Sequence, residues 1–195
     1  MKNTIKKSSH YQDWIDIGYK SFAQSGPLGI RVEALAKKSG VSKSSFYYYF
    51  GDQESFLEIL LDEHHYKAEK LAAEAKQCRT FVPAFVDVVM KYKSVVQFQR
   101  HLRINRENLH FQLAYQRAGD LVRREILNVW AEFIGVAPDM NMAGSLYIVI
   151  SDLFFERVRE GTYNPEWIKA LISEMQSIVE GLVERSNARR GKARV

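Results

Sequence analysis

The sequence predicts an all-α protein of about nine helices, with a small N-terminal domain followed by a larger helical body. Three observations lead to this fold class. Apolar residues recur at spacings of three and four along most of the 195 residues. No stretch of the sequence shows the strict apolar–polar alternation of a half-buried strand. The stretch 31–50 combines two short helical patterns on either side of a glycine turn.

Turn and capping residues divide the chain into its expected helices. Gly26, Gly51 and Gly161 follow helical patterns, and Asn164-Pro165 is a typical helix start. The expected helices cover 11–25, a segment ending near 39, 43–50, 52–77, a segment starting at Thr80, 95–103, 108–135, 142–160 and 165–185.

The turn in the stretch 31–50 is specified by its own residues. Val32, Leu35 and Ala36 have the spacing of one helix face, and Gly40 can adopt the left-handed conformation that ends a helix. Ser42 is then a suitable N-cap for the next helix. That second helix places Phe46 and Phe50 on one face and covers the rest with Lys, Ser and Tyr. The pattern is a helix-turn-helix with a polar, basic second helix, the element that enters a DNA major groove.

Composition limits the class of protein. The chain is 46% hydrophobic and 26% charged, as in a globular protein, and its net charge is +5. Residues 1–51 carry eight Lys or Arg against three Asp or Glu, whereas residues 52–184 carry fifteen against twenty. The single cysteine, Cys78, excludes an internal disulfide framework. With no signal sequence or membrane span expected, we predict a cytoplasmic protein with a basic DNA-facing end.

The run from Trp14 to Leu57 resembles the DNA-binding domain of the TetR family of transcriptional regulators. The resemblance covers about a quarter of the chain, in the family's order and spacing, and rests on Phe22, Gly26, Leu35, Ala36, Gly40–Lys43, Phe46–Phe50, Glu54 and Leu57. It implies a basic arm at 1–10, a helix-turn-helix domain at 11–51, a ligand-binding and dimerisation domain at 52–185 and a basic tail at 186–195.

DNA-contact residues are expected at the second helix of the motif and beside it. Lys43, Ser44, Ser45 and Tyr48 lie where base edges are read. Tyr47 and Tyr49 match family positions that contact phosphates. The sequence departs from the family at Arg31, where Thr or Ser is usual, and at Gln53, where Lys is common. The expected DNA-binding set is Arg31, Ser42, Lys43, Ser44, Ser45, Tyr47, Tyr48, Tyr49 and Gln53.

The last two helices are apolar over wide faces, and the resemblance implies that they pair two subunits. The expected homodimer interface is Leu146, Val149, Ile150, Leu153, Leu171, Met175, Ile178 and Leu182. A two-fold dimer suits a palindromic operator on double-stranded DNA. The alternative is that these helices form the core of a single chain.

The resemblance also implies a small-molecule effector in the body, and the aromatic residues favour an apolar or aromatic one. The candidates are Tyr92, Phe98, His101, His110, Tyr115, Trp130, Phe133, Tyr147 and Phe154, with plain core packing as the alternative for each. We find no catalytic motif, no metal-spaced set and no cofactor site, so an enzyme is not expected. Adjacent His64 and His65 are expected to be surface or packing residues. A ligand-independent regulator, or an activator instead of a repressor, remains open.

Overall fold

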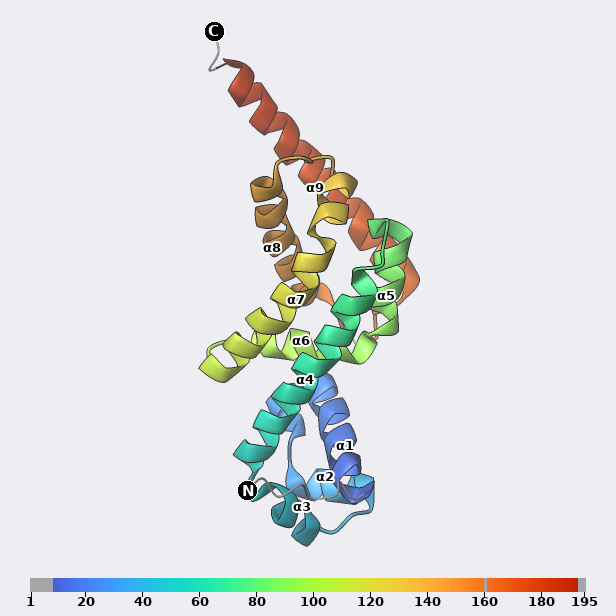
Figure 1. The fold of residues 1–195 in the computed structure, drawn as a ribbon, viewed down its shortest axis with the longest axis vertical. Helices are drawn as coiled ribbons and strands as arrows, with labels where there is room; N and C mark the ends of the chain where they lie inside the picture. Colours follow the sequence, from blue (N-terminus) through green and yellow to red (C-terminus); the bar gives the residue numbers. More distant parts are fainter. Residues whose placement is uncertain (1–8, 160, 193–195) are drawn as a thin grey trace. The chain divides into compact units, whose positions relative to one another are not determined.

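The computed structural model describes the backbone of residues 9–159 and 161–192 and the side chains of residues 10–159 and 161–182. Within these residues it contains nine α-helices, one short 3₁₀ helix, one π-helical turn and no strand (Figure 1). The expected all-α fold of about nine helices is therefore confirmed. Among the described helices, none has the length and apolarity that a membrane span requires.

The chain forms two compact units, and the first comprises residues 1–68 and 94–118. It holds α1 (Ser9–Ser25), the 3₁₀ turn η1 (Gly26–Gly29), α2 (Val32–Ser39), α3 (Lys43–Phe50), most of α4 (Gln53–Ala75), nearly all of α6 (Lys93–Ile104) and the start of α7 (Leu109–Phe133). In Figure 1, α1, α2 and α3 lie together beside the first turns of α4. Their core is rich in aromatic residues, including Trp14, Phe22, Phe46, Phe56 and Phe98, each 0% exposed.

Two features of the first unit fix how its helices pack. Gly18 allows α1 to approach α4 closely, because a Cβ at this position would lie 2.4 Å from Cζ of Phe56. A buried chain of hydrogen bonds joins four helices. His64 Nδ1 lies 2.9 Å from the Tyr19 hydroxyl, and His64 Nε2 lies 2.7 Å from Gln99 Oε1. The Gln99 amide then donates to the Tyr115 carbonyl at 2.8 Å.

His64 is thus a packing residue, as expected, but one with a defined polar role. Its ring is 1% exposed and stacks on Phe98 with centroids 4.4 Å apart. Burial lowers the pKa of His64 from 6.5 to about 4, against the opposing effect of the Gln99 hydrogen bond. The neutral ring uses one nitrogen as donor and one as acceptor, which suits a chain running from a hydroxyl to an amide oxygen.

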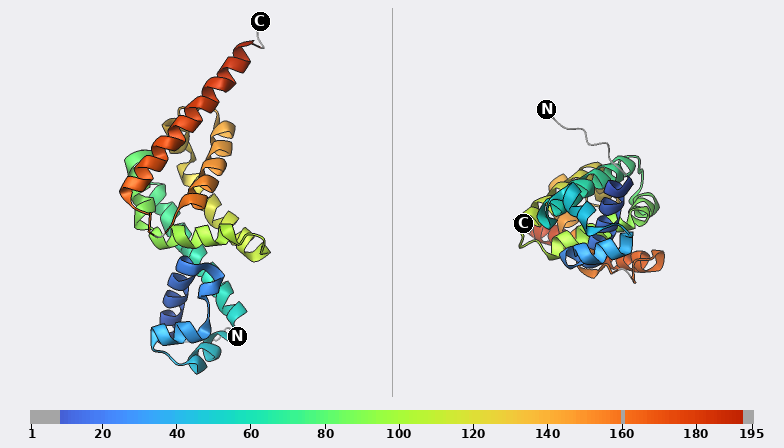
Figure 2. Two further views of the ribbon diagram at one scale, coloured as in Figure 1. Left: turned by 180° about the vertical axis from the view of Figure 1, so that it is seen from behind. Right: turned by 90° about the horizontal axis from the view of Figure 1, so that it is seen from below.

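The second unit comprises residues 69–93 and 119–195. It holds the end of α4, the π turn η2 (Phe81–Phe85), α5 (Val86–Lys91), the rest of α7, α8 (Met140–Arg157) and α9 (Pro165–Lys192). Its core joins α7, α8 and α9, which Figure 2 shows from two further sides. The core residues are Trp130, Ala131, Ile134, Val136, Ala143, Ile150, Leu171, Met175 and Val179.

Several helix boundaries differ from the sequence-based expectation. The helix expected from Thr80 begins only at Val86, because Val82 is extended (φ −116°, ψ 129°) and precedes Pro83, which disfavours helical backbone at that position. Helix α8 starts at Met140, since Asp139 caps it through an oxygen 3.0 Å from the Met142 nitrogen. Helix α9 continues to Lys192, so the predicted end near Arg185 was wrong.

Candidate nucleic-acid interface

The turn between α2 and α3 has the geometry that its sequence predicts. Gly40 lies in the left-handed region (φ 69°, ψ 9°), and its N–H donates to the Ala36 carbonyl at 3.0 Å, which closes α2. A Cβ added at Gly40 would meet nothing within 4 Å. The requirement for glycine here is therefore backbone conformation and not space.

The first turn of α3 is held from two sides. The Ser42 side chain caps the helix by accepting from the Ser45 nitrogen at 3.3 Å. The Ser45 hydroxyl donates to the Ser42 carbonyl at 2.7 Å and accepts from the Trp14 indole nitrogen at 3.1 Å. Because Trp14 is 0% exposed in the core, this contact ties the start of α3 to α1.

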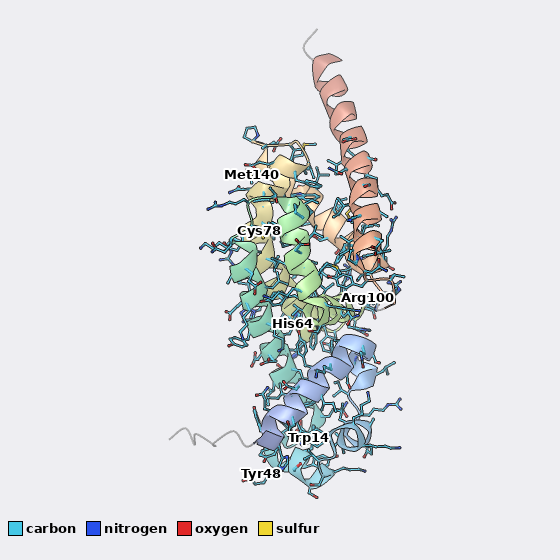
Figure 3. The ribbon with its side chains drawn as sticks, turned by 90° about the vertical axis from the view of Figure 1, so that its right-hand side faces the viewer. Trp14, Tyr48, His64, Cys78, Arg100 and Met140 are labelled. Atoms are coloured by element: carbon cyan, nitrogen blue, oxygen red, sulfur yellow. The ribbon has the colours of Figure 1, made fainter. Side chains whose placement is uncertain are left out.

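The three successive tyrosines of α3 occupy different environments. Phe46 and Phe50 turn inward, while Tyr47 is 51% and Tyr48 77% exposed. Tyr49 is partly buried and packs edge-on against Tyr11, with ring centroids 5.7 Å apart. Figure 3 labels Trp14 inside this unit and Tyr48 at its outer surface. The expectation that at least one of the three tyrosines points outward is confirmed, and two large aromatic side chains stand on the solvent face of α3.

A cation at the start of α3 is paired across the motif. The Lys43 ammonium lies 3.0 Å from a carboxylate oxygen of Glu33 on α2, and both side chains are exposed. The hydrogen bond from Lys43 lowers the pKa of Glu33. Glu33 was missed in the sequence because its partner lies ten residues away, beyond the three or four of a helical pair. Only the turn brings the two side chains together.

The remaining predicted contact residues also lie on the outside of this motif. Ser44, Arg31 and Gln53 are exposed. Arg31 is the extended residue before α2 (φ −109°, ψ 117°) and makes no side-chain cap, as its sequence predicts. Gln53 opens α4, behind Asp52, whose oxygen accepts from the Ser55 nitrogen at 2.7 Å. That hydrogen bond lowers the pKa of Asp52. All nine predicted residues thus belong to α2, α3 and the ends that flank them.

Residues 15–60, which hold this motif, match the sequence model of the family described as "Bacterial regulatory proteins, tetR family". The match covers 46 of the 195 residues, so it shows that this N-terminal segment is similar to that of tetR-family regulatory proteins. The resemblance expected from the sequence is confirmed, whereas the assignment of α2 and α3 to DNA binding stays a prediction.

Solved structures with the same fold support the match. A protein from Mesorhizobium loti MAFF303099 described as a TetR-family transcriptional regulator superposes with a TM-score of 0.56 at 15% identity, covering 89% of this chain and 94% of that one. A second such protein, from Rhodococcus sp., gives a TM-score of 0.53 at 19% identity, covering 91% and 98%. At these identities the likeness shows the fold alone. Comparison with curated proteins gave no match.

The predicted effector residues fall into both units. In the first, Phe98 is 0% exposed and stacks on Phe22 at 4.1 Å. Tyr115 packs against the same core, and His101, whose pKa is lowered by burial, lies edge-on to Phe22. His110 is exposed and pairs with Glu58 at 2.6 Å. These four residues therefore do not form one cluster in the first unit.

In the second unit, three predicted effector residues do come together. The centroid of the Trp130 ring lies 6.2 Å from that of Phe133 and 6.0 Å from that of Tyr147. The Phe81 ring packs on both Trp130 and Phe133. Burial raises the pKa of Tyr147 to about 12. The Tyr92 hydroxyl instead donates to Glu74 at 2.7 Å. Phe154 packs against the same core as Trp130, where its ring contacts are with Phe155, Tyr163 and Trp167.

An open groove of about 560 Å³ lies between α7 and α8 in the second unit. Arg123 on its wall pairs with Asp120 at 2.8 Å. The groove was not foreseen in the sequence, because its residues come from two helices and include both charged and apolar types. They are Asp120, Arg123, Arg124, Leu127, Met140, Asn141, Gly144, Ser145 and Ile148. Across the described residues, no three His, Cys, Asp or Glu side chains gather in a way that could hold a metal ion.

The predicted dimer residues divide by exposure. Val149 is 62%, Ile178 41% and Leu182 44% exposed. Ile150, Leu171 and Met175 lie in the core of the second unit, and Leu146 and Leu153 are partly buried. Ile148, which the sequence did not single out, is 52% exposed beside Val149.

Proposed function

We propose that this tetR-family regulator is a homodimeric repressor that binds a palindromic operator and leaves it when a small molecule occupies its body. The observation that carries the proposal is the exposed face of α3, with Tyr47 and Tyr48 held outward by the Trp14–Ser45 contact behind them. A helix fixed from behind presents its outer side chains to DNA with little loss of conformational entropy on binding.

We assign roles along this surface from chemistry and position. Lys43, Ser44 and Tyr48 contact base edges, where an ammonium pairs with guanine, a hydroxyl with several bases and an aromatic ring with the thymine methyl group. Ser45 is a positioning residue, because its hydroxyl already donates to Ser42 and accepts from Trp14. Phosphates are contacted by the exposed residues Arg31, Ser42, Tyr47 and Gln53 and by the partly buried Tyr49.

The dimer is supported by exposed apolar residues on both of the last two helices. Ile148 and Val149 on α8 and Ile178 and Leu182 on α9 each leave between 41% and 62% of their surface in contact with water. Two-fold pairing through these helices would cover them and would present two copies of α3 to half-sites one helical turn apart, roughly 34–36 Å. With chromosomal DNA as its partner, the protein would act in the cytoplasm.

The effector is proposed to be apolar or aromatic, bound beside Trp130, Phe133 and Tyr147. This cluster brings together three predicted residues, one of which is a phenol whose pKa is raised to about 12, a polar group that stays protonated at neutral pH. One observation favours a second candidate, a regulator without an effector. Trp130 is only 2% exposed, and its indole nitrogen already donates to the Ala143 carbonyl at 3.1 Å, as in ordinary core packing.

The test is binding to the DNA upstream of the protein's own coding region, measured over a range of salt concentrations. We expect selection of a palindrome and a steep loss of affinity with salt. Tyr47→Phe should weaken binding to every sequence alike, whereas the control Tyr66→Phe, on an exposed tyrosine of α4, should not. Absence of sequence selection at moderate salt would contradict the regulator assignment. A ligand screen for release from the operator separates the two effector candidates.

For the dimer, sedimentation of Val149→Asp and Ile178→Asp variants provides the measurement. Each places a charge on an exposed apolar position, so the monomer should keep its helical content while the dimer dissociates. The same substitution at Leu109, 61% exposed on α7, is a matched control and should leave the dimer intact. Equal sedimentation of all the variants as dimers would refute pairing through α8 and α9.

A further inference from the structure

Glu33 places a carboxylate on the surface that is proposed to face DNA, where phosphate repulsion makes a negative charge unfavourable. It lies in the first turn of α2, and its side chain is 68% exposed. Its one ion-pair partner among the described residues is Lys43, at the first position of α3, which is 53% exposed. The pair is therefore neutral as a whole, and both of its side chains are exposed.

The spacing within the pair matches a feature of one base pair. In a G·C pair the cytosine N4 donates to the guanine O6, so a donor and an acceptor lie one hydrogen-bond length apart, about 2.7–3.2 Å, on the major-groove edge. Lys43 Nζ and Glu33 Oε1 are 3.0 Å apart, with donor and acceptor in the complementary order. The ammonium has three N–H groups, so it can keep the bond to Glu33 while donating to O6 or N7.

We propose that Glu33 and Lys43 read a single G·C base pair together, the ammonium donating to guanine and the carboxylate accepting the outward N4–H of cytosine. The proposal rests on the proposed DNA-reading function of α3 and adds a residue from α2 to it. Glu33 has two effects in this arrangement. It selects cytosine directly, and it fixes the otherwise flexible Lys43 ammonium over the neighbouring guanine.

Alone, either side chain would discriminate less well. An unpaired lysine at Lys43 donates to any acceptor in reach, including phosphates, and an unpaired carboxylate at Glu33 is repelled by the backbone charges. As a pair they add no net charge and so contribute little to affinity for DNA in general. Their contribution is selectivity, because any other base pair at that step presents a wrong donor or acceptor to one of the two groups.

The experiment measures operator binding by wild type, Glu33→Ala, Lys43→Ala and the double variant, each against operators carrying all four base pairs at every half-site position. In wild type we expect one position at which G·C is preferred by roughly 5- to 150-fold, the range for one good bidentate contact. Each single variant should lose most of that preference at the same position, and the double variant should lose no more. Glu132→Ala, which removes an exposed carboxylate from α7, controls for net charge and should keep the preference.

Other results would overturn the pair reading. If Glu33→Ala raises affinity for every sequence by a similar factor and keeps the G·C preference, Glu33 only neutralises Lys43. If the two single variants lose preference at different positions, the residues read separately. Loss of all sequence selection in wild type would refute the proposed function as well, which distinguishes that failure from the first two.

Discussion

Acid should destabilise this protein through one buried histidine. His64 is 1% exposed, and burial lowers its pKa from 6.5 to about 4. Below pH 6.5 the His64 ring binds a proton in the unfolded chain but stays neutral in the native state, so the free energy of unfolding falls as pH falls. The loss accumulates until the pH reaches the native pKa, near 4.

The magnitude follows from the two pKa values. At about pH 5 the unfolded ring is almost fully protonated and the native ring about one tenth protonated, which costs about 2 kcal/mol of stability relative to about pH 7.5. That is a large part of the total stability of an ordinary domain. Lys67 on α4 and the adjacent His65 also disfavour a positive charge on the ring.

The assay is urea unfolding of wild type and His64→Gln at a series of pH values from about 7.5 to about 4.5. Glutamine does not titrate, so the variant should lose about 2 kcal/mol less stability than wild type on acidification to about pH 5. At neutral pH the variant is expected to be less stable than wild type. The control His65→Gln retains His64 with its Tyr19 and Gln99 partners. Its free energy of unfolding should therefore fall with decreasing pH as steeply as that of wild type. Parallel pH curves for wild type and His64→Gln would refute the reasoning, because the buried ring would then have no altered proton affinity.

Three further substitutions test how α3 and the helices that support it are held, each by chemical denaturation. Ser42→Ala removes the cap of α3 and should cost about 1 kcal/mol. Ser45→Ala leaves the buried Trp14 nitrogen without its acceptor and should cost about 1–3 kcal/mol; an unchanged denaturation midpoint would mean that the contact contributes nothing. Gly18→Ala drives a methyl group against Phe56 and should cost about 1–3 kcal/mol through overpacking, with normal stability showing that α1 and α4 can move apart.

The helix-turn-helix was predictable because its signals are local. Gly40 ends α2 and Ser42 caps α3 through contacts within three or four residues, so the sequence alone contains the whole interaction. Glu33 was not predictable as a partner of Lys43, since nothing in a helical pattern relates residues ten apart. The break at Val82 was missed for a different reason. Pro83 is compatible with a first helical turn, but it disfavours helical backbone at the residue before it, Val82.

The aromatic residues of the body show where sequence periodicity stops being informative. Spacing identifies the face of a helix that is buried, but the partner of that face depends on the other helices. Phe98 and Trp130 look equivalent in the sequence, as large aromatic residues on apolar helix faces. In the structure Phe98 stacks between Phe22 and the His64 ring in the first unit, while Trp130 packs with Phe81 in the second. Predicted effector residues on the two sides of this division therefore cannot be tested as one set. Variants of Trp130, Phe133 and Tyr147 test the proposed effector site, whereas variants of Phe98 test the core of the first unit.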